Sequence, residues 1–170
     1  TILETPEIIC KGGTGNLSAK ANGTTAPFTY KWYSNEGVLL SQMQQYSNVS
    51  AGVYKVMATD KYGCESSLVP YTFEEPTMIE AEFSMQVTGC GASDATGYIS
   101  LDTIYGGLEG NEYYFRWTTE ASIGDWEPYV DGKDWRINNL KAGMYICTIS
   151  NATDFLSCNI SKEFHTNPSM

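Results

Sequence analysis

Asn48-Val-Ser-Ala-Gly-Val-Tyr54-Lys-Val-Met-Ala-Thr-Asp-Lys-Tyr-Gly-Cys64 is a stretch that the chain contains twice. The second copy reads Asn139-Leu-Lys-Ala-Gly-Met-Tyr145-Ile-Cys-Thr-Ile-Ser-Asn-Ala-Thr-Asp-Phe-Leu-Ser-Cys158. Each copy contains an Ala-Gly turn, has Tyr two residues after the Gly, and ends in a polar turn that leads to Cys. Apolar residues alternate with polar ones after each Tyr, and this period of two predicts a half-buried β-strand.

The likeness between the two halves of the chain extends outward from this stretch. The first half has Cys10, an aromatic segment at 28–32 and Pro76, and the second half has Cys90, an aromatic segment at 113–117 and Pro168, in the same order. Shared landmarks in the same order over most of a chain indicate tandem repeats. We therefore predict two domains, residues 1–77 and residues 78–170.

The composition excludes several classes of protein. The chain has 170 residues and a formal net charge of −10, which the phosphates of nucleic acids and an anionic membrane surface would repel. No segment approaches the roughly 20 apolar residues of a membrane-spanning helix, so we expect no membrane insertion in this segment. Helical periodicity is absent, while β-branched and aromatic residues are plentiful, which predicts an all-β fold. Because the chain begins at Thr1, we expect it to be a processed piece of a longer protein.

Two alternating segments are predicted to face the core of the first domain, and the aromatic one supplies the largest buried area. Aromatic rings in such a segment bury about 150–250 Å² each. The second domain follows the same plan with longer connections, and its additional residues form a loop at 120–134. The predicted inward-facing residues are Phe28, Tyr30 and Trp32 in one strand and Tyr54, Val56 and Ala58 in another.

Five cysteines suit two small domains in an oxidising compartment. In the first domain the available pair is Cys10 with Cys64. In the second domain three cysteines compete. Tyr145-Ile-Cys147 is typical of an immunoglobulin F strand, which favours a bridge from Cys90 to Cys147.

Comparison of the two repeats favours a different bridge in the second domain. The position equivalent to Cys147 in the first repeat is Val56, which cannot form a disulfide. The comparison therefore favours Cys90 with Cys158 and leaves Cys147 as a free thiol on the core face. Zinc is disfavoured because the ligand spacings of zinc ribbons are missing and His165 is the one histidine.

Together these motifs resemble the SprB-type repeat of large secreted surface proteins of Bacteroidetes, which include gliding-motility adhesins. The first half matches through residues 27–32, 51–56 and 59–64, whereas the second keeps Trp117, residues 142–145 and Cys158 but lacks the Asp-x-x-Gly-Cys turn. The resemblance implies two tandem immunoglobulin-like β-sandwich domains, the second divergent, carried outside the cell as a stalk or adhesive surface. It implies no catalytic residues and no cofactor, because the motif positions are core aromatics, bends and cysteines.

The leading hypothesis is a non-enzymatic structural or adhesive module of a large secreted or cell-surface adhesin. The expected partners are neighbouring repeats of a longer chain, and a surface polysaccharide or another cell-surface protein. An enzyme is disfavoured because the Gly-x-Ser-x-Gly, His-Glu-x-x-His and P-loop patterns are absent.

A glycan-binding module is the alternative, and it uses the loop at 120–135. Aromatic rings there would stack on sugar faces while carboxylates accept hydrogen bonds from sugar hydroxyls. Against it, Trp135 would begin the next strand and pack in the core, and Trp126 would cover an end of the sandwich. Calcium is a further option for the acidic loop, although the EF-hand spacing is missing. The candidate ligand-binding residues are Trp126, Tyr129, Asp125, Glu127, Asp131 and Trp135, and the calcium candidates are Asp125, Asp131 and Asp134.

Short glycosylation motifs leave a third hypothesis open, a eukaryotic receptor ectodomain. Abundant Ser and Thr make several such matches expected by chance, and Asn is also favoured in turns for its backbone conformation. The Asn-x-Ser/Thr sequons begin at Asn16, Asn22, Asn48, Asn151 and Asn159.

Asp102-Thr103-Ile104 is a different kind of motif. It resembles the O-glycosylation site of Bacteroidetes secreted proteins.

Overall fold

The computed structural model describes residues 2–4, 8–86, 97–110, 112–151 and 158–166. Over these residues the chain forms fourteen β-strands and no helix, so the predicted all-β fold is confirmed. The chain divides into two compact units, Thr1–Pro76 and Thr77–Met170. Each unit is described by itself.

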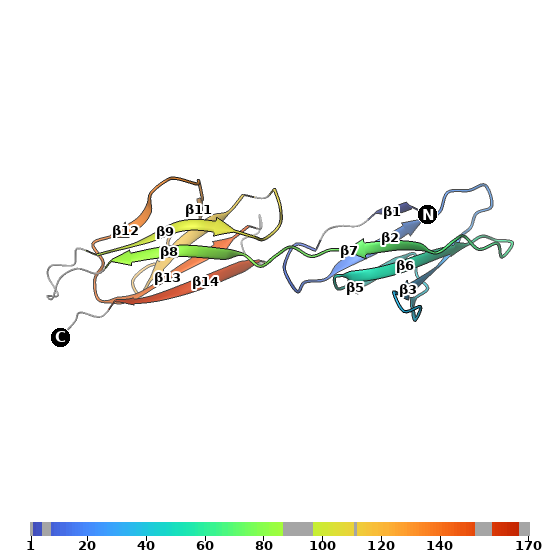
Figure 1. Cartoon of the computed structure of the whole chain (residues 1–170), viewed down its shortest axis with the longest axis horizontal. Coiled ribbons are helices and arrows are strands. Elements are labelled where there is room, and N and C mark those ends of the chain that lie inside the picture. Colours follow the sequence, from blue (N-terminus) through green and yellow to red (C-terminus); the bar gives the residue numbers. More distant parts are fainter. Residues whose placement is uncertain (1, 5–7, 87–96, 111, 152–157, 167–170) are drawn as a thin grey trace. The chain divides into compact units, whose positions relative to one another are not determined.

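The first unit is a sandwich of two antiparallel sheets, one of three strands and one of four (Figure 1). Its core lies between them and centres on the fully buried Trp32. The three-stranded sheet has the order β1 (Ile2–Glu4), β2 (Gly15–Lys20), β5 (Gln45–Val49). The four-stranded sheet has the order β4 (Leu39–Ser41), β3 (Thr29–Ser34), β6 (Gly52–Thr59), β7 (Val69–Phe73).

Alternation along β3 and β6 places the predicted residues inside. Tyr30 and Trp32 on β3 and Val56 and Ala58 on β6 are buried, and the half-buried Tyr54 packs against them. The polar atoms that these rings carry inward are satisfied. The indole Nε1 of Trp32 donates to the carbonyl oxygen of Met43 at 2.9 Å, and the Tyr30 hydroxyl accepts a hydrogen bond from the backbone N–H of Ala21 at 3.1 Å.

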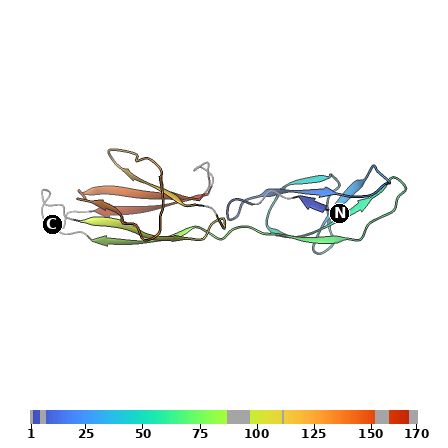
Figure 2. The same ribbon diagram turned by 90° about the horizontal axis from the view of Figure 1, so that it is seen from above.

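The second unit repeats this arrangement strand for strand. Figure 2 shows its two layers, with β8 and β9 in one and β13 and β14 in the other. The three-stranded sheet has the order β12 (Trp135–Asn138), β9 (Tyr98–Tyr105), β8 (Glu80–Gln86). The four-stranded sheet has the order β11 (Glu127–Pro128), β10 (Tyr114–Thr119), β13 (Gly143–Ser150), β14 (Asn159–Thr166). The chain is therefore a tandem pair of immunoglobulin-like β-sandwiches.

The repeated stretch is the corner where the chain crosses from one sheet to the other. Asn48 and Asn139 both adopt the left-handed backbone conformation, at φ 58° and 57°, which Asn tolerates better than most residues. The Tyr54 hydroxyl then donates to the carbonyl oxygen of Ser50 at 2.9 Å, and the Tyr145 hydroxyl donates to that of Lys141 at 3.2 Å. This is the tyrosine corner of immunoglobulin-like sandwiches.

The boundary between the units lies one residue before the predicted one. Thr77 belongs to the second unit because its carbonyl oxygen accepts the backbone N–H of Gly107 at 3.2 Å. Glu75 belongs to the first, because its carboxylate pairs with Lys11 and accepts the N–H of Gly12 at 2.6 Å. These bonds hold the pKa of Glu75 below its ordinary value, the Lys11 hydrogen bond being the larger cause.

The predicted bridge between Cys10 and Cys64 is wrong. Cys10 is disulfide-bonded, whereas Cys64 is an exposed free thiol. Cys10 precedes β2, which begins at the end of the sandwich where β6 also begins, and Cys64 follows β6 at the opposite end. The eight residues of β6 span about 25 Å, whereas a disulfide requires Cα atoms within about 7 Å.

The cysteines of the second unit differ in state. Cys147 is a free thiol with no exposed surface, and burial raises its pKa to about 12. Cys158 is disulfide-bonded. Cys90, its predicted partner, lies outside the described residues.

Candidate functional site

The loop that distinguishes the second unit runs from the end of β10 to the start of β12 and contains the short edge strand β11. Thr118 forms a β-bridge with Ile123 at the start of the loop. Phe115 pairs with Glu127 where the loop rejoins the sheet as β11. The sequence predicted six binding residues in this loop, and the structure distributes them over three different environments.

Trp126 lies on the outer face of the four-stranded sheet and is half-buried. The guanidinium carbon of Arg116 lies 4.8 Å from the centre of its ring, which is cation–π geometry. The Arg116 Nε is buried and has no hydrogen-bond partner among the described residues, and the guanidinium group lies over the indole face. Trp126 therefore covers Arg116 and not an end of the sandwich.

Trp135 is a core residue, which agrees with the expectation that it begins a strand and packs in the core. The ring is buried at the start of β12, its centre lies 5.0 Å from that of Phe115, and its Nε1 donates to the carbonyl oxygen of Val130 at 3.0 Å. The ammonium nitrogen of Lys133 lies 3.8 Å from the ring centre. No face of this indole is left for a sugar, so Trp135 is removed from the predicted site.

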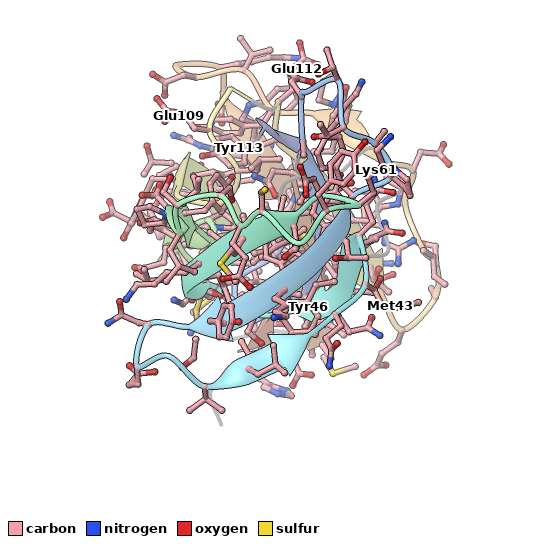
Figure 3. The ribbon with its side chains drawn as sticks, turned by 90° about the vertical axis from the view of Figure 1, so that its right-hand side faces the viewer. Met43, Tyr46, Lys61, Glu109, Glu112 and Tyr113 are labelled. Atoms are coloured by element: carbon pink, nitrogen blue, oxygen red, sulfur yellow. The ribbon has the colours of Figure 1, made fainter. Side chains whose placement is uncertain are left out.

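A hollow of about 430 Å³ lies where β9 ends and β10 begins. Its walls come from three separate segments of the chain. Two of the predicted residues, Tyr129 and Asp131, contribute to it, whereas Trp126, Asp125 and Glu127 do not. Two of its other residues, Glu112 and Tyr113, are labelled in Figure 3. The lining residues are Thr103, Ile104, Glu112, Tyr113, Pro128, Tyr129, Val130 and Asp131.

Both tyrosines of the hollow are fixed by their hydroxyls. Tyr113 donates to the carbonyl oxygen of Gly106 at 2.6 Å, and Tyr129 donates to that of Asp102 at 2.9 Å. Burial raises the pKa of both phenols, so they remain neutral donors at neutral pH. The Asp131 carboxylate is exposed, with one oxygen 3.4 Å from the Tyr129 hydroxyl. The hollow thus combines two fixed tyrosine rings with an exposed carboxylate, which would repel an anion.

The sequence did not predict Thr103, Glu112 and Tyr113 as site residues. Tyr113 reads as part of the aromatic strand, and Glu112 shows no pattern that separates it from other surface acids. Thr103 did stand out, within the Asp-Thr-aliphatic motif. In the structure it is half-buried and lines the hollow, so a glycan on Thr103 would occupy that space.

The sequons have structural roles at several positions. Asn151 is 2% exposed, and its Nδ2 donates to the carbonyl oxygen of Leu108 at 3.4 Å. In the folded protein the Asn151 side chain is therefore inaccessible to a glycosyltransferase. The Oδ1 of Asn16 accepts the backbone N–H of Asn48 at 3.4 Å, which joins two further sequons across β2 and β5.

Neither a metal site nor a membrane-spanning helix is found in the described part of the chain. No group of three or more His, Cys, Asp or Glu side chains there could hold a metal ion. The calcium candidates Asp125, Asp131 and Asp134 accordingly do not form a cluster. No helix within the same residues is long and apolar enough to cross a membrane.

Comparisons with known proteins show likeness in structure and not in sequence. No family profile matches the chain, and no curated protein matches it in sequence. Among solved structures it is similar to a two fibronectin type-III domain segment from chicken tenascin. That likeness has 13% sequence identity and a TM-score of 0.37, and it covers 97% of this chain and 98% of the tenascin segment.

Proposed function

We propose that the chain is a non-enzymatic structural or adhesive segment of a large secreted or cell-surface adhesin. The observation that carries this proposal is the use of the repeated residues. Tyr54 and Tyr145 close equivalent corners, Asn48 and Asn139 make equivalent turns, and Trp32 fills the core of its unit. The repeated residues therefore serve to build the same sandwich twice, and serial copies of one folded unit are what a spacer or adhesive array needs.

Two further observations support an extracellular location. Immunoglobulin-like sandwiches are common among cell-surface domains. Cys10 and Cys158 are disulfide-bonded, and disulfides persist mainly in oxidising compartments. The resemblance to the SprB-type repeat extends the proposal to a Bacteroidetes surface protein, including one that serves gliding motility. The partners would be neighbouring repeats, together with a surface polysaccharide or another surface protein.

The location is tested by shaving intact cells that make the protein with a protease that cannot enter them. Release of peptides from this chain, at a rate matching a known surface protein and before any cytoplasmic marker appears, is the expected result. Protection of the chain until the cells are lysed would reject a surface location.

A second candidate function is glycan binding, and the hollow of the second unit favours it. Sugar recognition combines flat aromatic surfaces with fixed polar acceptors. The hollow supplies the rings of Tyr113 and Tyr129 beside the exposed carboxylate of Asp131. This candidate differs from the sequence prediction, because it excludes Trp126 and Trp135.

Glycan binding is tested with an array of neutral and amino sugars, followed by titration of any hit. Saturable binding that Asp131→Asn weakens about tenfold would support the hollow, since an acceptor of charged hydrogen bonds contributes about 1.5–3 kcal/mol. The matched control is Trp126→Ala, which alters the same loop outside the hollow and should leave the affinity unchanged. Absence of binding up to about 1 mM ligand would reject this candidate.

A further inference from the structure

Strand β4 forms an edge of the four-stranded sheet in the first unit and is strongly apolar. Within the described part of the chain it pairs only with β3, through Trp32 with Ser41 and Tyr33 with Leu39. Its other side therefore carries backbone donors and acceptors that face away from the sheet. The side chains around it are exposed: Val38 is 61%, Leu39 46% and Met43 69% accessible.

The second unit provides an internal comparison for this edge. β11 occupies the same position in the sheet order, next to the strand that pairs with the corner strand. It consists of Glu127 and Pro128, which are a charge and a residue without an N–H. Charges and proline are the usual means by which proteins keep an edge strand from pairing with another chain. The same edge is thus protected in one unit and open in the other.

The open edge belongs to a stretch of sequence without charged side chains, residues 37–54, which we call the uncharged strip. No Asp, Glu, Lys or Arg occurs between Glu36 and Lys55, in a chain whose formal net charge is −10. Met43 and Tyr46, both labelled in Figure 3, lie on this strip. The corresponding region of the second unit, residues 122–145, carries seven charged residues: Asp125, Glu127, Asp131, Lys133, Asp134, Arg136 and Lys141.

We propose that β4 pairs antiparallel with β4 of a second copy of this chain. Two copies with a net charge of −10 repel each other, so they can approach best at an edge strand whose own residues, Leu39, Leu40 and Ser41, carry no charge. A strand that pairs antiparallel with itself does so about a two-fold axis, which brings the same apolar side chains together from both copies. Backbone hydrogen bonds supply affinity in such strand addition, and the apolar side chains supply the buried area.

The proposal reaches beyond a structural or adhesive role, because it assigns one surface and one partner. An edge of three residues makes a small interface, and small interfaces give weak, reversible association. Copies anchored side by side on one surface would meet at a high local concentration, where weak pairing is sufficient.

The test is sedimentation velocity of the whole chain from about 10 µM to about 1 mM, the range in which weak dimers form. We expect a monomer–dimer equilibrium that Leu39→Lys and Leu39→Glu each weaken at least tenfold. An equimolar mixture of the two variants should recover the dimer, because opposite charges then meet across the two-fold axis. Ile123→Lys is the matched control, since Ile123 is 70% exposed and lies in the second unit.

Thermal melting of each variant, followed by tryptophan fluorescence, checks that the first unit remains folded around Trp32. Met43→Lys provides a second charge on the strip if a variant at Leu39 does not fold. A monomer at every concentration, or equal dimerisation of the wild type and the Met43 and Leu39 variants, would overturn the proposal.

Discussion

At the scale of single residues, the two tyrosine corners are similar in place but not in detail. The Tyr145 hydroxyl both donates to the carbonyl of Lys141 and accepts its backbone N–H, at 3.2 and 2.9 Å. The Tyr54 hydroxyl donates to the carbonyl of Ser50. Tyr145 is also buried, whereas Tyr54 is half-buried. The corner of the second unit therefore depends more heavily on its hydroxyl.

This difference predicts unequal costs for removing the two hydroxyls. Tyr54→Phe should lower the free energy of unfolding by about 1 kcal/mol, and Tyr145→Phe by about 2 kcal/mol, because the part-buried backbone N–H of Lys141 then also loses its acceptor. Urea unfolding measures both values. Tyr62→Phe, at an exposed residue, is the control. Equal costs for the two corner variants would show that the second hydrogen bond of Tyr145 contributes nothing.

The free thiols of the described residues, Cys64 and Cys147, should differ sharply in reactivity. Cys64 is exposed, whereas Cys147 is fully buried with its pKa raised to about 12 by loss of solvent. Iodoacetamide at pH 8 should therefore alkylate Cys64 in the native protein and Cys147 only in denaturant, because the thiolate is the reacting form. Peptide mass spectrometry assigns each site. Rapid native alkylation of Cys147 would contradict its place in the core.

At the scale of elements, the turn from β9 to β10 depends on glycine. Gly106 has φ +79°, and a Cβ placed there would lie 2.0 Å from the carbonyl oxygen of Met78. Gly110 has a similar φ of +82° but no neighbouring atom within 4 Å. The two positions share the same backbone requirement and differ only in the space around them.

Alanine substitution at these glycines separates the cost of the positive φ from the cost of steric overlap. Gly110→Ala should destabilise the protein by about 1 kcal/mol through its backbone conformation alone. Gly106→Ala should cost at least about 3 kcal/mol, because the backbone of Met78 has to move as well. Thermal or urea unfolding of both variants gives the difference, and equal values would show that the approach to Met78 is not tight.

Alternation and the internal repeat were sufficient to predict the strands and the faces of β3 and β6 that point inward. Both signals are local, and a period of two directly encodes which side chains share a face. The predicted bridge from Cys10 to Cys64 was wrong because the two residues lie at opposite ends of the first sandwich. Alternation shows which face of a strand a residue occupies, but not at which end of the sandwich it lies. The predicted binding site was incomplete for a related reason. The hollow gathers β9, the start of β10 and the loop, whereas the prediction considered the loop alone.

At the scale of the whole molecule, disulfide bonding should contribute a large share of the stability, because each domain is small. Reduction should lower the melting temperature, since losing a disulfide that closes a long loop costs about 2–4 kcal/mol. Calorimetry with and without reductant measures the change. Cys64→Ser is the control, because Cys64 is a free thiol and its replacement should leave the melt and its response to reductant unaltered. A melt that reductant does not shift would show that disulfide bonding at Cys10 and Cys158 does not stabilise the fold.

The path of the chain through each sandwich has a mechanical consequence. In the first unit β1 begins where β2 ends, and β7 ends where β6 begins, so the chain enters at one end and leaves at the other. The second unit repeats this with β8 and β14. Tension along the protein would therefore run parallel to the terminal strands and perpendicular to their hydrogen bonds. The bonds of each ladder would share the load in shear and would have to break together, instead of opening one after another like a zip.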